Sequence, residues 1–168
     1  MLFVTGAPGA GKSAVAAPLA RLIPDFAVLD MDVLLEPAGA LARVDLRADG
    51  AANLWPAYND LWIRLAAELA KVRPVLLLGP LIPREVDHTA SRRRLLRIDW
   101  VLLDCSNGTR RERLGERGYG PAAIERAIVD AEETRGLGLD AIATDGRTPE
   151  QTASDVADWA AHVSDRLV

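Results

Sequence analysis

Residues 6–13 read GAPGAGKS, and they lie between a short apolar run at residues 2–4 and a segment with helical spacing of apolar residues. The octapeptide matches the pattern G-x-x-x-x-G-K-[S/T] in the strand-then-helix context that this motif requires. Gly6, Gly9 and Gly11 allow backbone torsions and close approaches that a Cβ atom would block. The N–H groups of such a loop form a concave anion site at the N-terminus of the following helix. The sequence therefore predicts a site for a nucleoside triphosphate.

Each part of this loop has an expected contact. Lys12 is expected to reach the β- and γ-phosphates as a point charge, and the Ser13 hydroxyl is expected to bind Mg²⁺. The other residues expected to surround the phosphates are Gly6, Ala7, Pro8, Gly9, Ala10 and Gly11. ATP and Mg²⁺ are therefore the expected cofactors, although the motif itself does not separate ATP from GTP.

The composition is typical of one globular domain. The chain has 168 residues, 49% of them hydrophobic and 26% charged, with a net charge of −4, so we expect a single domain over residues 1–168. A negative net charge argues against non-specific electrostatic binding to nucleic acid or to an acidic membrane. The single cysteine, Cys105, excludes an intrachain disulfide, which predicts a reducing, cytoplasmic location. A local basic run is expected on a solvated helix: Arg92, Arg93, Arg94 and Arg97.

Short apolar runs alternate with helical patterns along the chain. The expected strands are residues 2–4, 26–29, 75–78, 100–103 and 140–143. Strands separated by helices imply right-handed crossovers and a parallel sheet with helices on both faces, an α/β fold. Ligands of such sheets bind beyond the carboxyl ends of the strands, which places the phosphate loop there.

Several helices have recognisable ends. The first is expected over residues 12–22, another begins near Pro56 and buries a stripe of Leu61, Leu65 and Leu69, and a third runs from Pro121 to Gly136. A capping box of Thr148 and Gln151 begins the last helix at Pro149. Residues 36–52 show no clear pattern.

Two carboxylates follow the second expected strand. Asp30 and Asp32 would point the same way if the strand continued through them, and that end of the strand faces the phosphate site. One could hold Mg²⁺ while the other accepts the proton of an acceptor hydroxyl. The alternative is that one of them only caps a short helix beginning near Val33. Asp104, after the fourth strand, is a second candidate for the metal, although a strand-end cap is the preferred interpretation.

Taken together, GAPGAGKS, VLDMD at residues 28–32 and the arginine-rich segment 103–118 resemble the small P-loop kinases. This group includes shikimate kinase, gluconate kinase, chloramphenicol phosphotransferase and the nucleoside monophosphate kinases. The resemblance spans nearly the whole chain and implies a three-layer fold with a five-stranded parallel sheet in the order 2-3-1-4-5. It also implies a mobile lid, at about residues 115–136, and phosphorylation of a small hydroxylated molecule by ATP.

The resemblance further implies roles for individual residues. Asp30 would belong to the Mg²⁺ shell and Asp32 would meet the acceptor hydroxyl, with Arg113 near the adenine and Arg117 reaching the phosphates from the lid. Gly115, Gly118 and Gly120 interrupt the helical pattern and are expected to act as hinges. The alternative is that the arginines form a solvated helix face, which is expected of at least two members of this set: Arg110, Arg111, Arg113 and Arg117.

The acceptor is less defined by the sequence. Trp55 and Tyr58 lie where the resembling kinases cover their acceptor, and Arg84 could meet an anionic group on it. Only Gly79 and Pro80 stand where shikimate kinase has a glycine-rich acceptor loop, so the resemblance weakens there.

The expected function is that of an ATP-dependent kinase for a small hydroxylated molecule. Alternatives are an antibiotic-modifying phosphotransferase, a nucleoside or nucleotide kinase, and a nucleotide-binding module without turnover. The expected partners are ATP and a small substrate, without nucleic acid or membrane, and the protein would be a monomer or a homodimer.

Overall fold

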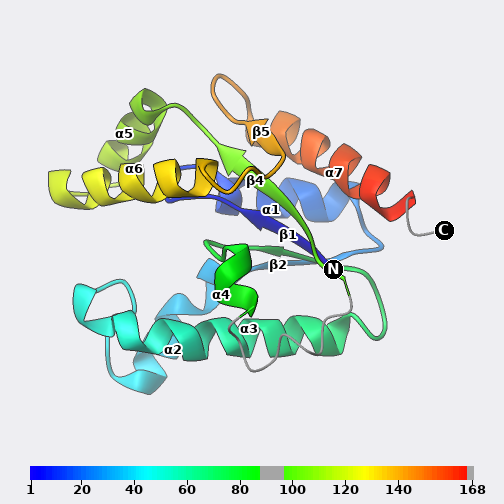
Figure 1. Ribbon diagram of the computed structural model, residues 1–168, viewed down its shortest axis with the longest axis horizontal. Helices are drawn as coiled ribbons and strands as arrows, with labels where there is room; N and C mark the ends of the chain where they lie inside the picture. The colour runs from blue at the N-terminus through cyan, green and yellow to red at the C-terminus, as the bar shows by residue number, and fades with distance from the viewer. Residues whose placement is uncertain (88–96, 166–168) are drawn as a thin grey trace.

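The strands form one parallel sheet in the order β2-β3-β1-β4-β5 (Figure 1), in a computed structural model that describes residues 1–87 and 97–165. This is the order that the resemblance implies, and the expected α/β fold is confirmed. The strands are β1 (Leu2–Thr5), β2 (Ala27–Asp30), β3 (Val75–Leu78), β4 (Asp99–Asp104) and β5 (Ala141–Ala143). Both neighbours of β1 are parallel to it, with Val4 opposite Leu78 on one side and Val101 on the other.

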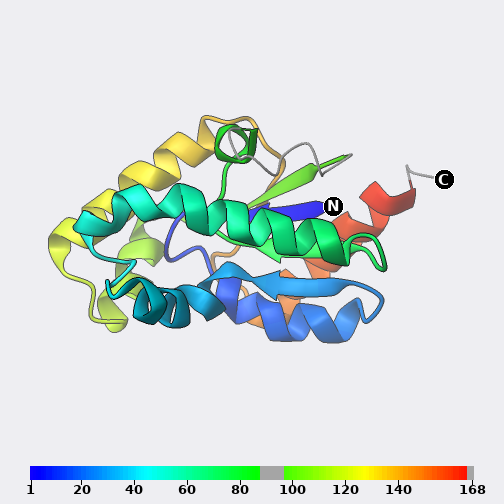
Figure 2. The same cartoon turned by 90° about the horizontal axis from the view of Figure 1, so that it is seen from below.

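Helices cover both faces of the sheet (Figure 2). They are α1 (Lys12–Leu22), α2 (Leu35–Ala42), α3 (Trp55–Leu69), α4 (Pro83–Asp87), α5 (Asn107–Glu116), α6 (Pro121–Arg135) and α7 (Pro149–Asp165), with 3₁₀ turns η1 (Met31–Leu34) and η2 (Asp49–Leu54). None of the helices within the described ranges is long and apolar enough to span a membrane. Of the predicted arginine run, only Arg97 lies among the described residues, where it is exposed and pairs with Asp99 at 3.0 Å.

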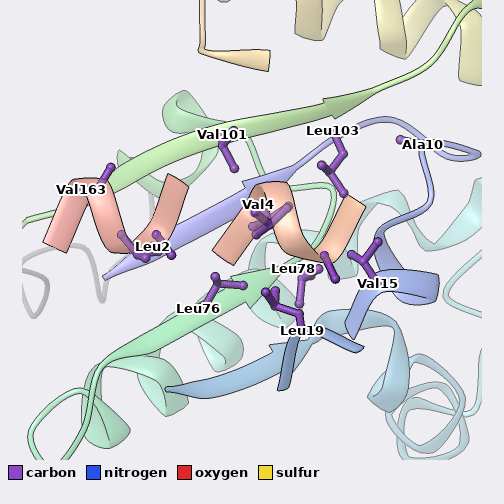
Figure 3. Close-up of a cluster of buried hydrophobic side chains, with 13 residues drawn as sticks. Leu2, Val4, Ala10, Val15, Leu19, Leu76, Leu78, Val101, Leu103 and Val163 are labelled. Atoms are coloured by element: carbon purple, nitrogen blue, oxygen red, sulfur yellow. The ribbon is translucent and has the colours of Figure 1, made fainter. Parts of the chain in front are cut away.

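The alternation of side chains along the strands creates two apolar layers. Leu2 and Val4 of β1 point to one face, where they pack with Val15 and Leu19 of α1 and with α7 (Figure 3). Phe3 points to the other face, which α3 and α4 cover. Because successive side chains of a strand face opposite ways, a strand buried on both faces is apolar at every position, as β3 is. The phosphate loop begins where β1 leaves this core.

The expected buried stripe of α3 is wrong. Leu61 and Leu65 are 52% and 40% exposed, and the helix instead buries the face that carries Tyr58, Trp62 and Ile63. These three residues lie at the spacing i, i+4 and i+5, which is as helical as the leucine spacing. Large aromatic side chains remove more apolar area from water than the leucines would, so they take the core face.

Local boundaries differ from expectation in several places. The unpatterned residues 36–52 contain all but the first residue of α2 and most of η2, and the pattern of α2 is concealed because its Leu41 is 88% exposed. β2 begins and ends one residue later than predicted. Gly115 lies inside α5, which continues to Glu116, so it does not interrupt the helix as predicted.

The capping box at the start of α7 is confirmed. The Thr148 backbone N–H donates to the Gln151 side chain at 2.9 Å, and the Gln151 N–H donates to the Thr148 hydroxyl at 3.2 Å. The pair satisfies two backbone donors that a helix start leaves without intrahelical partners. It fixes the start of a helix that packs against α1, the helix that follows the phosphate loop.

Replacing Thr148 by Ala should lower the free energy of unfolding by about 1 kcal/mol, because one of the two cap hydrogen bonds is lost. Urea denaturation followed by circular dichroism measures this change. Ser154→Ala, at an exposed position within α7, is the matched control and should leave stability unchanged or slightly raised. Equal stabilities of the Thr148→Ala variant and the wild type would contradict the cap.

Candidate functional site

The loop at residues 6–11 leaves the end of β1 inside the core and enters α1 at Lys12. Gly6 has a φ of +153°, and a Cβ atom there would lie 2.4 Å from the carbonyl oxygen of Leu103. Gly11 precedes α1 with a φ of +100°, in the region that favours glycine. The glycines are therefore required by the backbone itself, as the sequence predicts.

Lys12 is folded back onto its own loop. Its Nζ donates to the carbonyl oxygens of Gly6 at 2.5 Å and Ala7 at 3.3 Å, and the side chain is buried. Burial lowers the pKa of Lys12 to about 8, with Asp32 and Asp30 acting against this shift and Arg110 and Arg117 adding to it. The ammonium group is thus poorly compensated where it stands, which favours an incoming anion.

Side chains from distant parts of the chain bind the next three carbonyls of the loop. Arg110 of α5 donates to Pro8, and Arg113 of α5 donates to Gly9 at 3.1 Å. The Thr144 hydroxyl, just after β5, donates to Ala10 at 3.1 Å and accepts from Arg113 at 2.9 Å. Together with the lysine contacts, every carbonyl of residues 6–10 accepts a side-chain hydrogen bond.

These contacts decide which way the peptide groups of the loop point. In a trans peptide the carbonyl of one residue and the N–H of the next point in opposite directions. The three carbonyls held by α5 and Thr144 therefore turn the N–H groups that follow them to the opposite side, although the Ala10 N–H is itself bonded to the Ala7 carbonyl at 3.2 Å. A concave arrangement of N–H groups at a helix N-terminus is an anion site.

The two acids behave differently from each other. β2 ends at Asp30, whose side chain accepts the backbone N–H of Asp32 at 3.0 Å and so caps η1. Asp30 therefore acts as a cap, which was the alternative interpretation, and the strand does not continue through Asp32. Asp32 is exposed, and its Oδ2 accepts from the Ser13 hydroxyl at 3.4 Å. The structure thus brings Asp32, the second acid, to the end of the phosphate loop.

Asp104 takes part in a network of arginines. Its carboxylate accepts from Arg110 at 2.7 Å and from Arg135 of α6 at 2.6 Å. β4 does lie beside β1, but on the side away from β3 and β2. Asp104 is therefore an ion-pair partner of two arginines at the end of its strand.

A cavity lies beside the first turn of α1. It has a volume of about 280 Å³ and is lined from α1, from the end of α5 and from the segment between β5 and α7. Arg113 and Arg117, the two arginines expected at the nucleotide, both line it, together with Thr144 and Pro149. The cavity adjoins Gly11, so a group bound there would continue directly into the loop.

The arginines of α5 and Arg117 just after it differ in exposure. Arg111 is exposed and pairs with Glu125 at 3.2 Å, which fits the solvated face, whereas Arg117 is exposed and lines the cavity. Arg110 is 0% exposed and Arg113 is half-buried. The loop contact of Arg110 could not be predicted from the sequence, because nothing in the periodicity separates it from its neighbour Arg111.

The expected acceptor residues lie in different surroundings. Tyr58 is buried, and its hydroxyl donates to the carbonyl of Met31, so it supports the turn that carries Asp32. Trp55 is half-buried and stands edge-on to Tyr58, with ring centroids 5.7 Å apart. Arg84 on α4 is exposed, and its Nη2 lies 3.5 Å from Glu133 of α6.

The acidic side chains fit a magnesium ion that arrives with its nucleotide. Within residues 1–87 and 97–165, no group of three or more His, Cys, Asp or Glu side chains could hold a metal by itself. Magnesium in nucleotide sites is held by one or two protein oxygens, by water and by the phosphates. The neighbouring oxygens of Ser13 and Asp32 match that requirement.

The burial of Lys12 predicts a pH effect on stability without nucleotide. Its pKa is about 8 in the folded protein and 10.5 in the reference state, so the unfolded chain binds more protons between these values. The free energy of unfolding of the wild type, relative to Lys12→Met, should therefore rise as the pH increases from about 8 to 10.5, by roughly 3 kcal/mol at most.

Urea denaturation of both proteins across this pH range measures the difference. Lys71→Met removes a lysine from an exposed pair with Glu68 and is the control, for which a much smaller change is expected. A difference between wild type and Lys12→Met that stays constant with pH would show that Lys12 is not destabilised by its burial.

Solved structures of similar fold include several small kinases. A scan of the sequence against protein-family models finds no match, and neither does a search of curated proteins. Among solved structures, the chain is similar to a gluconokinase from Sinorhizobium meliloti 1021, with 21% identity, 99% of this chain and 94% of that one covered, and a TM-score of 0.65.

Two further solved structures have a similar fold. Shikimate kinase from Acinetobacter baumannii, in complex with shikimate, has 17% identity, a TM-score of 0.65, and 99% and 94% of the two chains covered. The tunicamycin resistance protein of Deinococcus radiodurans has 16% identity, a TM-score of 0.69, and 95% and 94% covered. At these identities the likeness concerns the fold, and the chain has the fold of the small P-loop kinases.

Proposed function

We propose that the protein is an ATP-dependent phosphotransferase that moves the γ-phosphoryl group to a hydroxyl of a small molecule. The observation that carries this proposal is the phosphate loop itself, with its carbonyls bonded outward and Asp32 beside Ser13 at its end. Phosphoryl transfer needs mainly positioning and electrostatic stabilisation, for which a preformed anion site and a nearby carboxylate are suited. The similar kinase folds support the same reaction class.

In this proposal the loop and Lys12 bind the polyphosphate. When phosphates enter, the Lys12 ammonium exchanges its loop carbonyls for phosphate oxygens, which compensate its charge better. The N–H groups on the inside of the loop bind the same oxygens. Arg117, exposed at the end of α5 and lining the adjoining cavity, is the further cation for the transferring group.

We assign the Mg²⁺ contacts to Ser13 and Asp32 rather than to Ser13 and Asp30. The Asp32 carboxylate is the one that contacts the Ser13 hydroxyl, whereas that of Asp30 holds the backbone N–H of Asp32. When bound, Mg²⁺ neutralises phosphate charge and fixes the orientation of the phosphate chain. The second oxygen of Asp32 remains suited to orient the acceptor hydroxyl and to accept its proton.

The cavity beside α1 is proposed to hold the base of the nucleotide. Arg113 forms part of its wall and is fixed there by bonds to Gly9 and to the Thr144 carbonyl, the latter at 2.8 Å. A guanidinium held in this way presents a planar face on which a base can stack. The acceptor would lie on the other side of the loop, near Asp32 and Trp55, with Arg84 as the candidate for an anionic group on it.

The assignment of the acids predicts different effects for two matched variants. Asp32→Asn should lower kcat at least a hundredfold and raise the Mg²⁺ concentration needed for half-maximal activity, because it removes the charge at Ser13. Asp30→Asn should lower kcat less than tenfold, because an amide oxygen still accepts the Asp32 N–H. Steady-state assays of ADP release with the acceptor, at several Mg²⁺ concentrations, measure both effects.

Asp25→Asn, exposed in the turn two residues before β2, is the control and should behave as wild type. If Asp30→Asn were the more damaging change, Asp30 would be the metal residue and the present assignment would be wrong.

The acceptor itself is sought by measuring ADP release across a panel of hydroxylated metabolites and antibiotics. A sharp response to one hydroxyl compound supports a kinase, whereas nucleotide binding with no response across the panel supports a module without turnover.

A further inference from the structure

Arg110 is a charged side chain in the interior of the protein. It is 0% exposed, and its Nε has no hydrogen-bond partner among the described residues. Burying a guanidinium is costly even when it is paired, and apolar side chains of similar volume often replace buried ion pairs without loss of stability. Stability alone is therefore a poor explanation for an arginine at this position.

The contacts of Arg110 join the end of β4 to the phosphate loop. Its Nη2 donates to Asp104 at 2.7 Å and to the Cys105 carbonyl at 3.4 Å, while its Nη1 donates to the carbonyl of Pro8. Its stem packs against Gly9, where a Cβ atom would lie 3.0 Å from Cγ of the arginine. Arg110 thus touches the loop at two adjacent residues from outside the anion site.

The bond to Pro8 fixes the peptide group between Pro8 and Gly9. The structure contains no cis peptide bond in its described residues, so the Gly9 N–H points opposite to the Pro8 carbonyl. With that carbonyl drawn outward to Arg110, the Gly9 N–H is directed to the inside of the loop. Gly9 itself adopts a φ of +84°, a conformation open to glycine that needs an external contact to select it from others.

Asp104 holds Arg110 in place and is shared with α6. Arg135, the last residue of α6, donates to both oxygens of Asp104 at 2.6 and 3.2 Å and to the Cys105 carbonyl at 2.8 Å. A carboxylate held by two guanidinium groups is restrained from both sides. It therefore presents Arg110 to the loop in one orientation.

We propose that Arg110, held by Asp104, is a positioning residue that directs the Gly9 N–H into the phosphate site. This rests on the proposed nucleotide-binding function, because the N–H group acts only on a bound phosphate. Arg110 makes no contact with the nucleotide, and its effect is to select the loop conformation that binds. Nucleotide affinity should therefore depend on Arg110 even where stability does not.

The Arg110→Met variant separates these two effects. Methionine fills the buried space without a charge and without a donor for the Pro8 carbonyl. We expect an unfolding temperature equal to or above that of the wild type, and an affinity for Mg·ADP that is about tenfold weaker, measured by isothermal titration calorimetry. In the wild type, the Gly9 amide resonance should shift on adding Mg·ADP, and this shift should be smaller in the variant.

Arg111→Met is the matched control, since Arg111 is the neighbouring arginine and pairs with Glu125 on the protein surface. It should bind Mg·ADP as the wild type does. If Arg110→Met binds Mg·ADP with unchanged affinity, the positioning role is overturned while the proposed function stands. If the wild type binds neither Mg·ADP nor Mg·ATP, the proposed function fails and the positioning role fails with it.

A second variant tests the positioning role of Arg110 if Arg110→Met does not fold. Asp104→Asn keeps the shape and an acceptor oxygen for Arg110 but removes the charge that both arginines share. It should weaken Mg·ADP binding about threefold or more at a wild-type-like unfolding temperature. Unchanged binding in a folded Asp104→Asn protein would overturn the proposal.

Discussion

A loop that turns an N–H group toward one side must place the carbonyl of the same peptide group on the other. A buried carbonyl without a partner costs free energy comparable to a lost hydrogen bond. The chain meets this requirement with side chains: Lys12 for the first two carbonyls, Arg110 and Arg113 for the next two, and Thr144 for the last. The anion site therefore depends on α5 and on the end of β5 as much as on its own glycines.

This arrangement concentrates positive charge in a chain whose net charge is −4. Lys12 and Arg110 are buried, and Arg113 is half-buried beside them. Asp104 balances Arg110 at 2.7 Å, whereas Asp32 and Asp30 act on Lys12 without overcoming its loss of water, as its lowered pKa shows. The positive charge that is left incompletely compensated is that of Lys12, at the phosphate loop. A polyphosphate supplies the missing negative charge where it is needed.

The fold and the phosphate loop could be predicted from the sequence because the residues that determine them lie in short contiguous segments. The glycines and Lys12 occupy one octapeptide, the strands are short apolar runs, and the cap of α7 lies within four residues. The buried face of α3 could not be predicted, because Leu61 and Tyr58 offer equally helical stripes and tertiary packing chooses between them.

The site residues also divide into those with a local sequence signal and those whose contacts depend on tertiary packing. Ser13 was expected to share the Mg²⁺ with Asp30, but the residue that its hydroxyl contacts is Asp32. That contact depends on β2 ending at Asp30, which only the turn at η1 decides. Arg110 and Arg111 are neighbouring arginines that differ in burial: Arg110 is 0% exposed, whereas Arg111 lies on the surface. Such a difference arises from the angle at which α5 meets the loop, a tertiary property without a local sequence signal.

The attachments of α6 are unequal, and this bears on where the expected lid can move. At its end, Arg135 binds Asp104 and the Cys105 carbonyl, and the side chains of Arg135 and Asp104 are 34% and 20% exposed. One contact of α6 with α4 is the pair of Glu133 with Arg84, whose side chains are 63% and 67% exposed. Exposed pairs contribute at most about 1 kcal/mol and are weakened by salt. The Glu133–Arg84 pair is therefore a weaker attachment of α6 than the contacts of Arg135 with Asp104 and the Cys105 carbonyl at the end of β4.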